Sequence, residues 1–286
     1  SDYYSTGVTA TVTNAAYASY ERVNPFSYTN ATTLGAAAMG GQGFGGNFWT
    51  VDSGTFTAQT NYGTAVVDSV PKFVNMNNYP AMAGNLVVAS DPGNGGSAKA
   101  QRSLESAINS GTFYIAFMMS YQYRGANKWA GVSLFNGGTE KAFFGKGAGG
   151  NWSTLGAGDG TTTYWSAFDM GEFYSGTGNT GNVYLVVGKY EFGTKLLAAK
   201  AYRILDGASF PETEPSWDVS TTLGTGIDSI DRIKLNTGST DGGATIGKVF
   251  FDEIRYATNW AGLIAVTCPS WAGSNTINGV AWTAAS

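Results

Sequence analysis

Val249-Phe250-Phe251-Asp252-Glu253-Ile254 is a short run of β-branched, aromatic and acidic residues near the C-terminal end of the chain. β-Branched and aromatic residues favour strands. Similar runs stand at 8–13, 114–118, 183–187 and 232–235, and clusters of Gly, Asn, Asp and Ser separate them. A helical period of 3.6 residues is sustained over three turns nowhere, although 97–110 fits a short helix as well as a strand. The pattern predicts an all-β fold of two packed antiparallel sheets.

Composition narrows the classes of function. The 286 residues suffice for one large core, but only 13% of them are charged and 41 are Gly. A net charge of −4 provides no basic stripe, which argues against nucleic-acid binding and against polybasic membrane docking. The longest apolar runs, 113–119 and 263–266, are far shorter than the roughly 18 residues of a membrane helix, so no membrane span is expected.

The two ends differ from the middle because they are nearly free of charge and rich in Ser, Thr, Ala, Gly and Asn. We therefore predict an N-terminal strand or arm at 1–19, one domain at 20–262 and a C-terminal strand or arm at 263–286. The chain begins with Ser1 rather than Met, which suggests removal of a signal peptide. We accordingly expect a secreted protein, either extracellular or at the cell surface.

The sequence predicts no catalytic residues. Gly41-Gln42-Gly43-Phe44-Gly45-Gly46 matches a dinucleotide fingerprint, but no strand precedes it and no helix follows. The chain has no histidine, which removes the usual base of nucleophilic triads. Glycoside hydrolysis needs only two carboxyl groups, yet no E-x-D-x-E run is present, and Glu212 and Glu214 stand beside prolines. A polysaccharide lyase or hydrolase with dispersed residues remains a third alternative.

Aromatic residues and turn oxygens supply candidate binding residues. Four aromatic residues in a stretch rich in Gly, Ser and Thr are candidate glycan contacts, although filling the core is the commoner use of such residues: Trp152, Tyr164, Trp165 and Tyr174. No cofactor is predicted, but Asp159, Asp241 and Asp252 are weak candidates for calcium. Asn30 and Asn151 lie in N-x-[ST] patterns and are candidate glycosylation sites.

Several segments together resemble the LamG-like, concanavalin A-like jelly-roll domains of secreted and surface-anchored bacterial proteins. The resemblance covers roughly 20–262 and is carried by the glycine-rich 40–46 leading to Trp49, by 131–140, and by 251–260, which contains Asp252-Glu253-Ile254-Arg255. It implies a sandwich of a dozen or so strands, with the D-E-I-R strand pairing near the N-terminal strand. It also implies a non-catalytic module for glycan contact or adhesion.

Two functions follow from these observations. The first is a structural surface protein whose subunits assemble into a filament or lattice, as a homo-oligomer or polymer, through strands of the terminal arms. The residues assigned to that assembly are Val8, Ala10, Val12, Leu263, Ile264, Val266 and Cys268. The alternative is a carbohydrate-binding or adhesion module that uses the loop aromatics.

Overall fold

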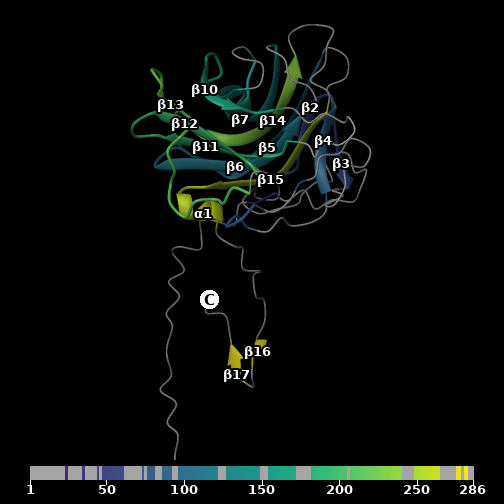
Figure 1. Cartoon of the computed structure of the whole chain (residues 1–286), viewed down its shortest axis with the longest axis vertical. Helices are drawn as coiled ribbons and strands as arrows, with labels where there is room; N and C mark the ends of the chain where they lie inside the picture. The colour runs from purple at the N-terminus through teal and green to yellow at the C-terminus, as the bar shows by residue number, and fades with distance from the viewer. Residues whose placement is uncertain are drawn as a thin grey trace, which may run out of the picture.

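The structure is a computed structural model of the whole chain. It describes residues 23–24, 34–35, 44, 47–60, 73, 76–80, 86–91, 96–121, 127–148, 154–171, 182–204, 207–239, 248–264, 275–277 and 280–282. Two antiparallel sheets are packed against each other (Figure 1). The expected all-β sandwich is therefore confirmed, and its order of strands is that of a jelly roll.

The larger sheet has eight strands. Seven follow one another in the order β13 (Val219–Thr222), β12 (Leu196–Arg203), β11 (Tyr184–Glu191), β6 (Thr112–Tyr121), β15 (Val249–Ala257), β4 (Leu86–Asp91) and β3 (Thr55–Thr60). The eighth, β1 (Val23–Asn24), pairs with β15, with Asn24 opposite Ile254. The implied pairing of the D-E-I-R strand near the N-terminal strand is thus confirmed.

The smaller sheet has seven strands, in the order β10 (Thr163–Asp169), β9 (Thr154–Gly158), β8 (Thr139–Lys146), β7 (Lys128–Asn136), β14 (Ile230–Ser239), β5 (Ser97–Ile108) and β2 (Thr50–Ser53). β5 occupies the segment that fits either a helix or a strand by sequence. Its burial alternates residue by residue from Ser97 to Leu104, which is the period of a strand with one buried face.

The main core lies between the two sheets. Alternate residues of the seven-stranded sheet point into it, including Ala100, Val132 and Leu235, and meet Phe117 and Phe251 from the other sheet. The residues between them must point to the opposite side, because successive side chains of a strand alternate. That opposite side, called the outer face below, therefore displays a separate set of side chains.

A second apolar cluster covers the other side of the eight-stranded sheet. It joins Met118 of β6 and Phe250 of β15 to the short helix α1 (Trp260–Ile264). The rings of Phe210 and Trp260 stack there, with centroids 4.9 Å apart. Since this face is covered from within the chain, the outer face of the seven-stranded sheet is the better candidate for binding.

The C-terminal prediction is partly wrong. Leu263 and Ile264 were expected in a strand or an extended arm, but they belong to α1, and Leu263 is fully buried in the second cluster. Packing against that cluster stabilises the helical turn. Val8, Ala10, Val12, Val266 and Cys268 lie outside the described residues. Farther along, β16 (Asn275–Ile277) and β17 (Val280–Trp282) pair with each other. No helix in the described part is long and apolar enough to cross a membrane.

Candidate functional site

A pocket of about 290 Å³ opens on the outer face of the seven-stranded sheet. Lys99 of β5, Trp129 of β7 and Asn236 of β14 line one part of it. Glu140 and Phe143 of β8, the turn at 160–163, and small residues at 147, 148 and 158 line the rest. The lining combines two aromatic side chains with six polar or charged ones. The volume is near the lower end of the usual range for small-molecule sites, roughly 300–1,000 Å³.

Glycines on the strands let two aromatic rings lie against the sheet. A Cβ added at Gly238 would be 2.3 Å from Cζ2 of Trp129, and one added at Gly131 would be 2.8 Å from Cζ of Phe143. Real Cβ atoms do not approach so closely, so both positions require glycine. As a result, the indole of Trp129 covers the backbone of its neighbour and forms part of the pocket lining.

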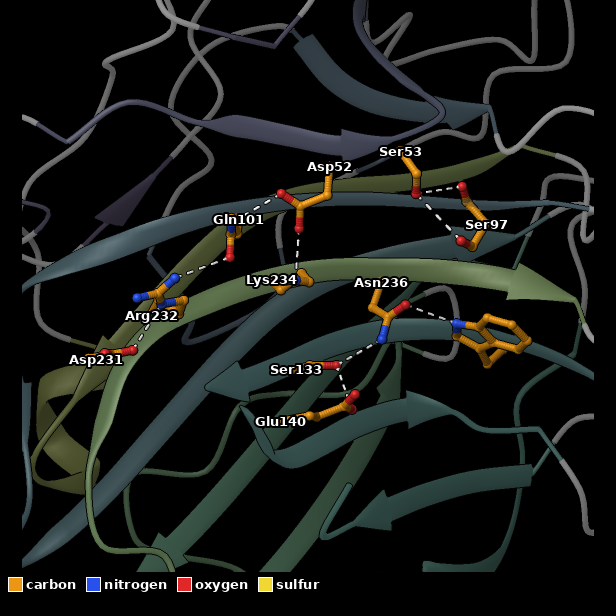
Figure 2. Close-up of polar contacts among 11 residues, drawn as sticks. Asp52, Ser53, Ser97, Gln101, Ser133, Glu140, Asp231, Arg232, Lys234 and Asn236 are labelled. Carbon is orange, nitrogen blue, oxygen red and sulfur yellow. Dashed lines mark hydrogen bonds and ion pairs between the residues drawn. The ribbon is translucent and has the colours of Figure 1, made fainter. Parts of the chain in front are cut away.

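A chain of hydrogen bonds links the polar residues of the pocket (Figure 2). Nε1 of Trp129 donates to Oδ1 of Asn236 at 3.0 Å, and Nδ2 of Asn236 donates to Oγ of Ser133 at 3.1 Å. Ser133 Oγ donates in turn to Oε1 of Glu140 at 2.9 Å. Three strands, β14, β7 and β8, contribute to the chain, so its geometry is fixed by the pairing of the sheet.

Ion pairs occupy the part of the outer face beyond the pocket (Figure 2). Lys234 lies 2.7 Å from Asp52, and Arg232 lies 3.0 Å from Asp231. Gln101 bridges the two pairs, since its amide donates to Asp52 at 3.0 Å and its oxygen accepts from Arg232 at 3.5 Å. These side chains hold one another in place across β2, β5 and β14.

Glu140 carries the negative charge of the pocket. Burial raises the pKa of its carboxyl group above the ordinary value. The hydrogen bond from Ser133 and the positive charges of Lys99 and Lys234 act in the opposite direction, and burial outweighs them. Glu140 therefore holds a partly desolvated charge whose hydrogen bonds are strong when they form.

The structure places the predicted glycan contacts in different surroundings. Tyr164 and Trp165 are consecutive in β10, so their side chains point to opposite faces. Tyr164 packs against the main core. The ring of Trp165 covers Gly147, where an added Cβ would lie 2.6 Å from Cη2, and Gly147 lines the pocket. Trp152 and Tyr174 lie outside the described residues.

Two of the calcium candidates have other roles in the described part of the chain. Oδ1 of Asp159 accepts hydrogen bonds from the backbone of Thr161 and Thr162, at 3.0 and 2.8 Å, and thereby closes the turn between β9 and β10. Asp252 is 2% exposed, and its Oδ1 accepts from the backbone N of Glu253 at 2.8 Å. No group of three potential metal ligands occurs among the described residues. Asp241, Asn30 and Asn151 lie outside them.

The acidic residues of the D-E-I-R strand are not exposed. Asp252 and Glu253 are buried like every other residue of β15, because the main core and the second apolar cluster cover the two faces of the eight-stranded sheet. β15 also has a bulge between Asp252 and Arg255, where Glu253 adopts a φ of 48°. Glu253 accepts a hydrogen bond from Nη2 of Arg255 at 3.0 Å.

Glu214 lies in a loop, as the prolines around it suggest. It accepts hydrogen bonds from Tyr114 at 2.6 Å, Lys189 at 2.7 Å and Trp217 at 3.0 Å. Burial alone would raise the pKa of its carboxyl group, but these bonds outweigh that effect and lower it. The residue ties the loop to the eight-stranded sheet, on the side of the molecule away from the pocket.

Known proteins of similar structure share little sequence with this chain. No family model matches the chain, and no curated protein matches its sequence. A glycosyl hydrolase family protein from Mycobacterium fortuitum is similar in structure, with a TM-score of 0.45, 11% identity, and coverage of 83% of this chain and 99% of that one. The lectin UEA-II, complexed with galactose, has a TM-score of 0.42 and 9% identity, and the match covers 80% of this chain and 98% of the lectin. A sialidase has a TM-score of 0.38 and 12% identity, and the match covers 64% of this chain but 16% of the sialidase.

The fold is a jelly roll of two antiparallel sheets. The order of strands in the two sheets agrees with the resemblance seen in the sequence. At identities of 9 to 12% and TM-scores of 0.38 to 0.45, these similarities say nothing of a ligand. The chemistry of this chain must therefore be argued from its own pocket.

Proposed function

We propose that this chain is a carbohydrate-binding module that holds its ligand in the outer-face pocket. The observation that carries the proposal is the joint presence of the Trp129 ring and the chain of hydrogen bonds that ends on Glu140. Sugars present apolar C–H faces and hydroxyl groups together. An aromatic ring suits the first, and a carboxylate and an amide suit the second.

We propose further that the module is not catalytic. Glycoside hydrolysis uses two carboxyl groups roughly 5–9.5 Å apart. Glu140 is the one carboxyl group among the described residues that line the pocket. Asp52, on β2, is four strands away in the sheet, or about 19 Å at a strand spacing of about 4.8 Å. Asp52 is also engaged with Lys234.

The test is a binding survey by isothermal titration calorimetry. It uses neutral oligosaccharides cut from glucan, xylan, mannan and galactan, and acidic ones cut from polygalacturonate and alginate. Wild-type protein should bind at least one of them, and Trp129→Ala should weaken that binding roughly tenfold, or about 1.4 kcal/mol. Phe48→Ala serves as the matched control, because Phe48 is 46% exposed and does not line the pocket.

Failure of every sugar to bind would refute the proposal, as would equal affinities of Trp129→Ala and wild type. Reducing-end assays on the same mixtures test the non-catalytic part, which predicts no new chain ends. Assembly through the terminal arms remains a separate prediction, and so does secretion, which a module that binds extracellular glycans would require.

A further inference from the structure

The positive charges on the outer face are matched by nearby carboxylates in the part of the chain that the structure describes. Lys234 pairs with Asp52 at 2.7 Å and Arg232 with Asp231 at 3.0 Å. Lys99 is the cation that lines the pocket, and its charge acts on Glu140. The lining of the pocket therefore sums to zero charge. An anionic ligand would find no excess of positive charge there.

The direction of the hydrogen bonds decides what the pocket offers a ligand. Trp129 donates to Asn236, Asn236 to Ser133, and Ser133 to Oε1 of Glu140, so each donor points towards the carboxylate. Oε2 of Glu140 accepts no hydrogen bond from the described residues. It is the acceptor that remains for a hydroxyl group of the ligand. A carboxylate or sulfate placed there would instead meet a like charge in a partly desolvated site, where repulsion is strong.

From these two observations, and resting on the proposed function, we infer that Glu140 is the specificity-determining residue of the pocket. It admits neutral sugars by accepting from their hydroxyl groups. It excludes uronic and sulfated sugars by its own charge and by cancelling the charge of Lys99. The same residue thus provides attraction for one class of sugar and repulsion for the other.

The decisive variant is Glu140→Gln, which keeps the size of the side chain and an oxygen that accepts from Ser133. Loss of the charge weakens the bond from a sugar hydroxyl, so the best neutral ligand should bind roughly tenfold more weakly. Lys99 is then uncompensated, so polygalacturonate or alginate fragments should bind at least about fivefold more tightly than to wild type. That gain should shrink at high salt.

Two further variants isolate the cause. Adding Lys99→Met to Glu140→Gln should abolish the gain for acidic fragments, because the uncompensated charge is gone. Glu105→Gln is the matched control: Glu105 is an exposed acid on β5 that does not line the pocket, so it changes the net charge equally without touching the site. It should leave the affinities for both classes of sugar unchanged.

The outcomes separate the inference from the proposed function. If wild-type protein binds acidic fragments as well as neutral ones, or better, the inference is wrong while carbohydrate binding stands. An unchanged ratio of acidic to neutral affinity in Glu140→Gln has the same meaning. Absence of any binding overturns both. Should Glu140→Gln fail to fold, the wild-type ranking of the two classes still decides the matter.

Discussion

Trp129 and Gly238 face each other across β7 and β14, and the indole of one occupies the space that a side chain on the other would fill. A Cβ at Gly238 would lie 2.3 Å from Cζ2 of the ring. The hydrogen bond from Nε1 to Asn236 holds the same ring from a second direction. The orientation of the Trp129 ring in the pocket lining is thus set by its hydrogen bond to Asn236 and by the space that Gly238 leaves open.

Replacing Gly238 with Ala should disturb the pocket more than the fold. The added methyl group must displace the Trp129 ring, and overpacking of this kind costs about 1–3 kcal/mol of stability. Thermal unfolding should show that loss, and calorimetry should show at least about a tenfold loss of sugar affinity in a protein that remains folded. Gly224→Ala is the matched control, since nothing lies within 4 Å of the added atom. Unchanged affinity in Gly238→Ala would contradict the assigned role of Trp129.

Binding of a neutral sugar should weaken as the pH falls. Burial raises the pKa of Glu140, so its carboxylate takes up a proton at a higher pH than an ordinary glutamate. Once Glu140 is protonated, its carboxyl group no longer offers a sugar hydroxyl a charged acceptor for a hydrogen bond. The affinity for the sugar should therefore be constant near neutral pH. It should fall as the pH drops through the raised pKa of Glu140, with the uptake of up to one proton per site. Titration calorimetry from pH 7 down to about 4 measures the profile, and Glu140→Gln should give a flat one.

The strands were largely predictable, because apolar and β-branched runs separated by Gly and Asn turns report a local property of the chain. The pocket was not. Trp129 and Asn236 are 107 residues apart, and only the neighbouring positions of β7 and β14 bring them together. A local signal for the outward position of Trp129 did exist. Core residues alternate along β7 from Ala130, so Trp129, one residue earlier, points to the outer face. The aromatic residues of the Gly-rich stretch instead suggested Tyr164 as a glycan contact, but the alternation of side chains along β10 points it towards the main core.

The D-E-I-R strand shows the same limit. Its local pattern predicted the strand β15, and the family resemblance implied that this strand pairs near the N-terminal strand, as β15 does with β1. The bulge at Glu253 was not predicted, because a positive φ at a glutamate has no sequence signal and is imposed by packing. Glu253 pairs with Arg255, and the two charges are buried beside Tyr79 of the second apolar cluster.

Breaking that pair should destabilise the domain strongly. Arg255 and Glu253 are joined at 3.0 Å, with side chains 7% and 0% exposed. Arg255→Met would leave the Glu253 carboxylate without this partner, and losing one member of a buried pair costs about 3–5 kcal/mol. The double variant Arg255→Met/Glu253→Gln should be less destabilised than the sum of the single variants. Urea unfolding of all four proteins measures the coupling, and additive losses would show that the pair is not coupled.

Lys146 should make stability rise with pH between about 8 and 10. Burial, with a smaller contribution from the charge of Lys128, lowers the pKa of Lys146 to about 8. The unfolded chain would hold this proton up to its ordinary pKa near 10.4. Between the two values the unfolded state binds more protons, so the unfolding free energy increases with pH, by up to about 3 kcal/mol in total.

The measurement is the melting temperature at intervals from pH 7.5 to 9.5, a range that ends before tyrosine titrates in the unfolded chain. Wild-type protein should become more stable across it, whereas Lys146→Met, which has no proton to lose, should not. Lys141→Met is the matched control on the same strand, because the one ion pair that Lys141 makes with the described residues is a 4.0 Å contact with an exposed Asp228. It should keep the wild-type rise. A rise that persists in Lys146→Met would mean that another group is responsible for it.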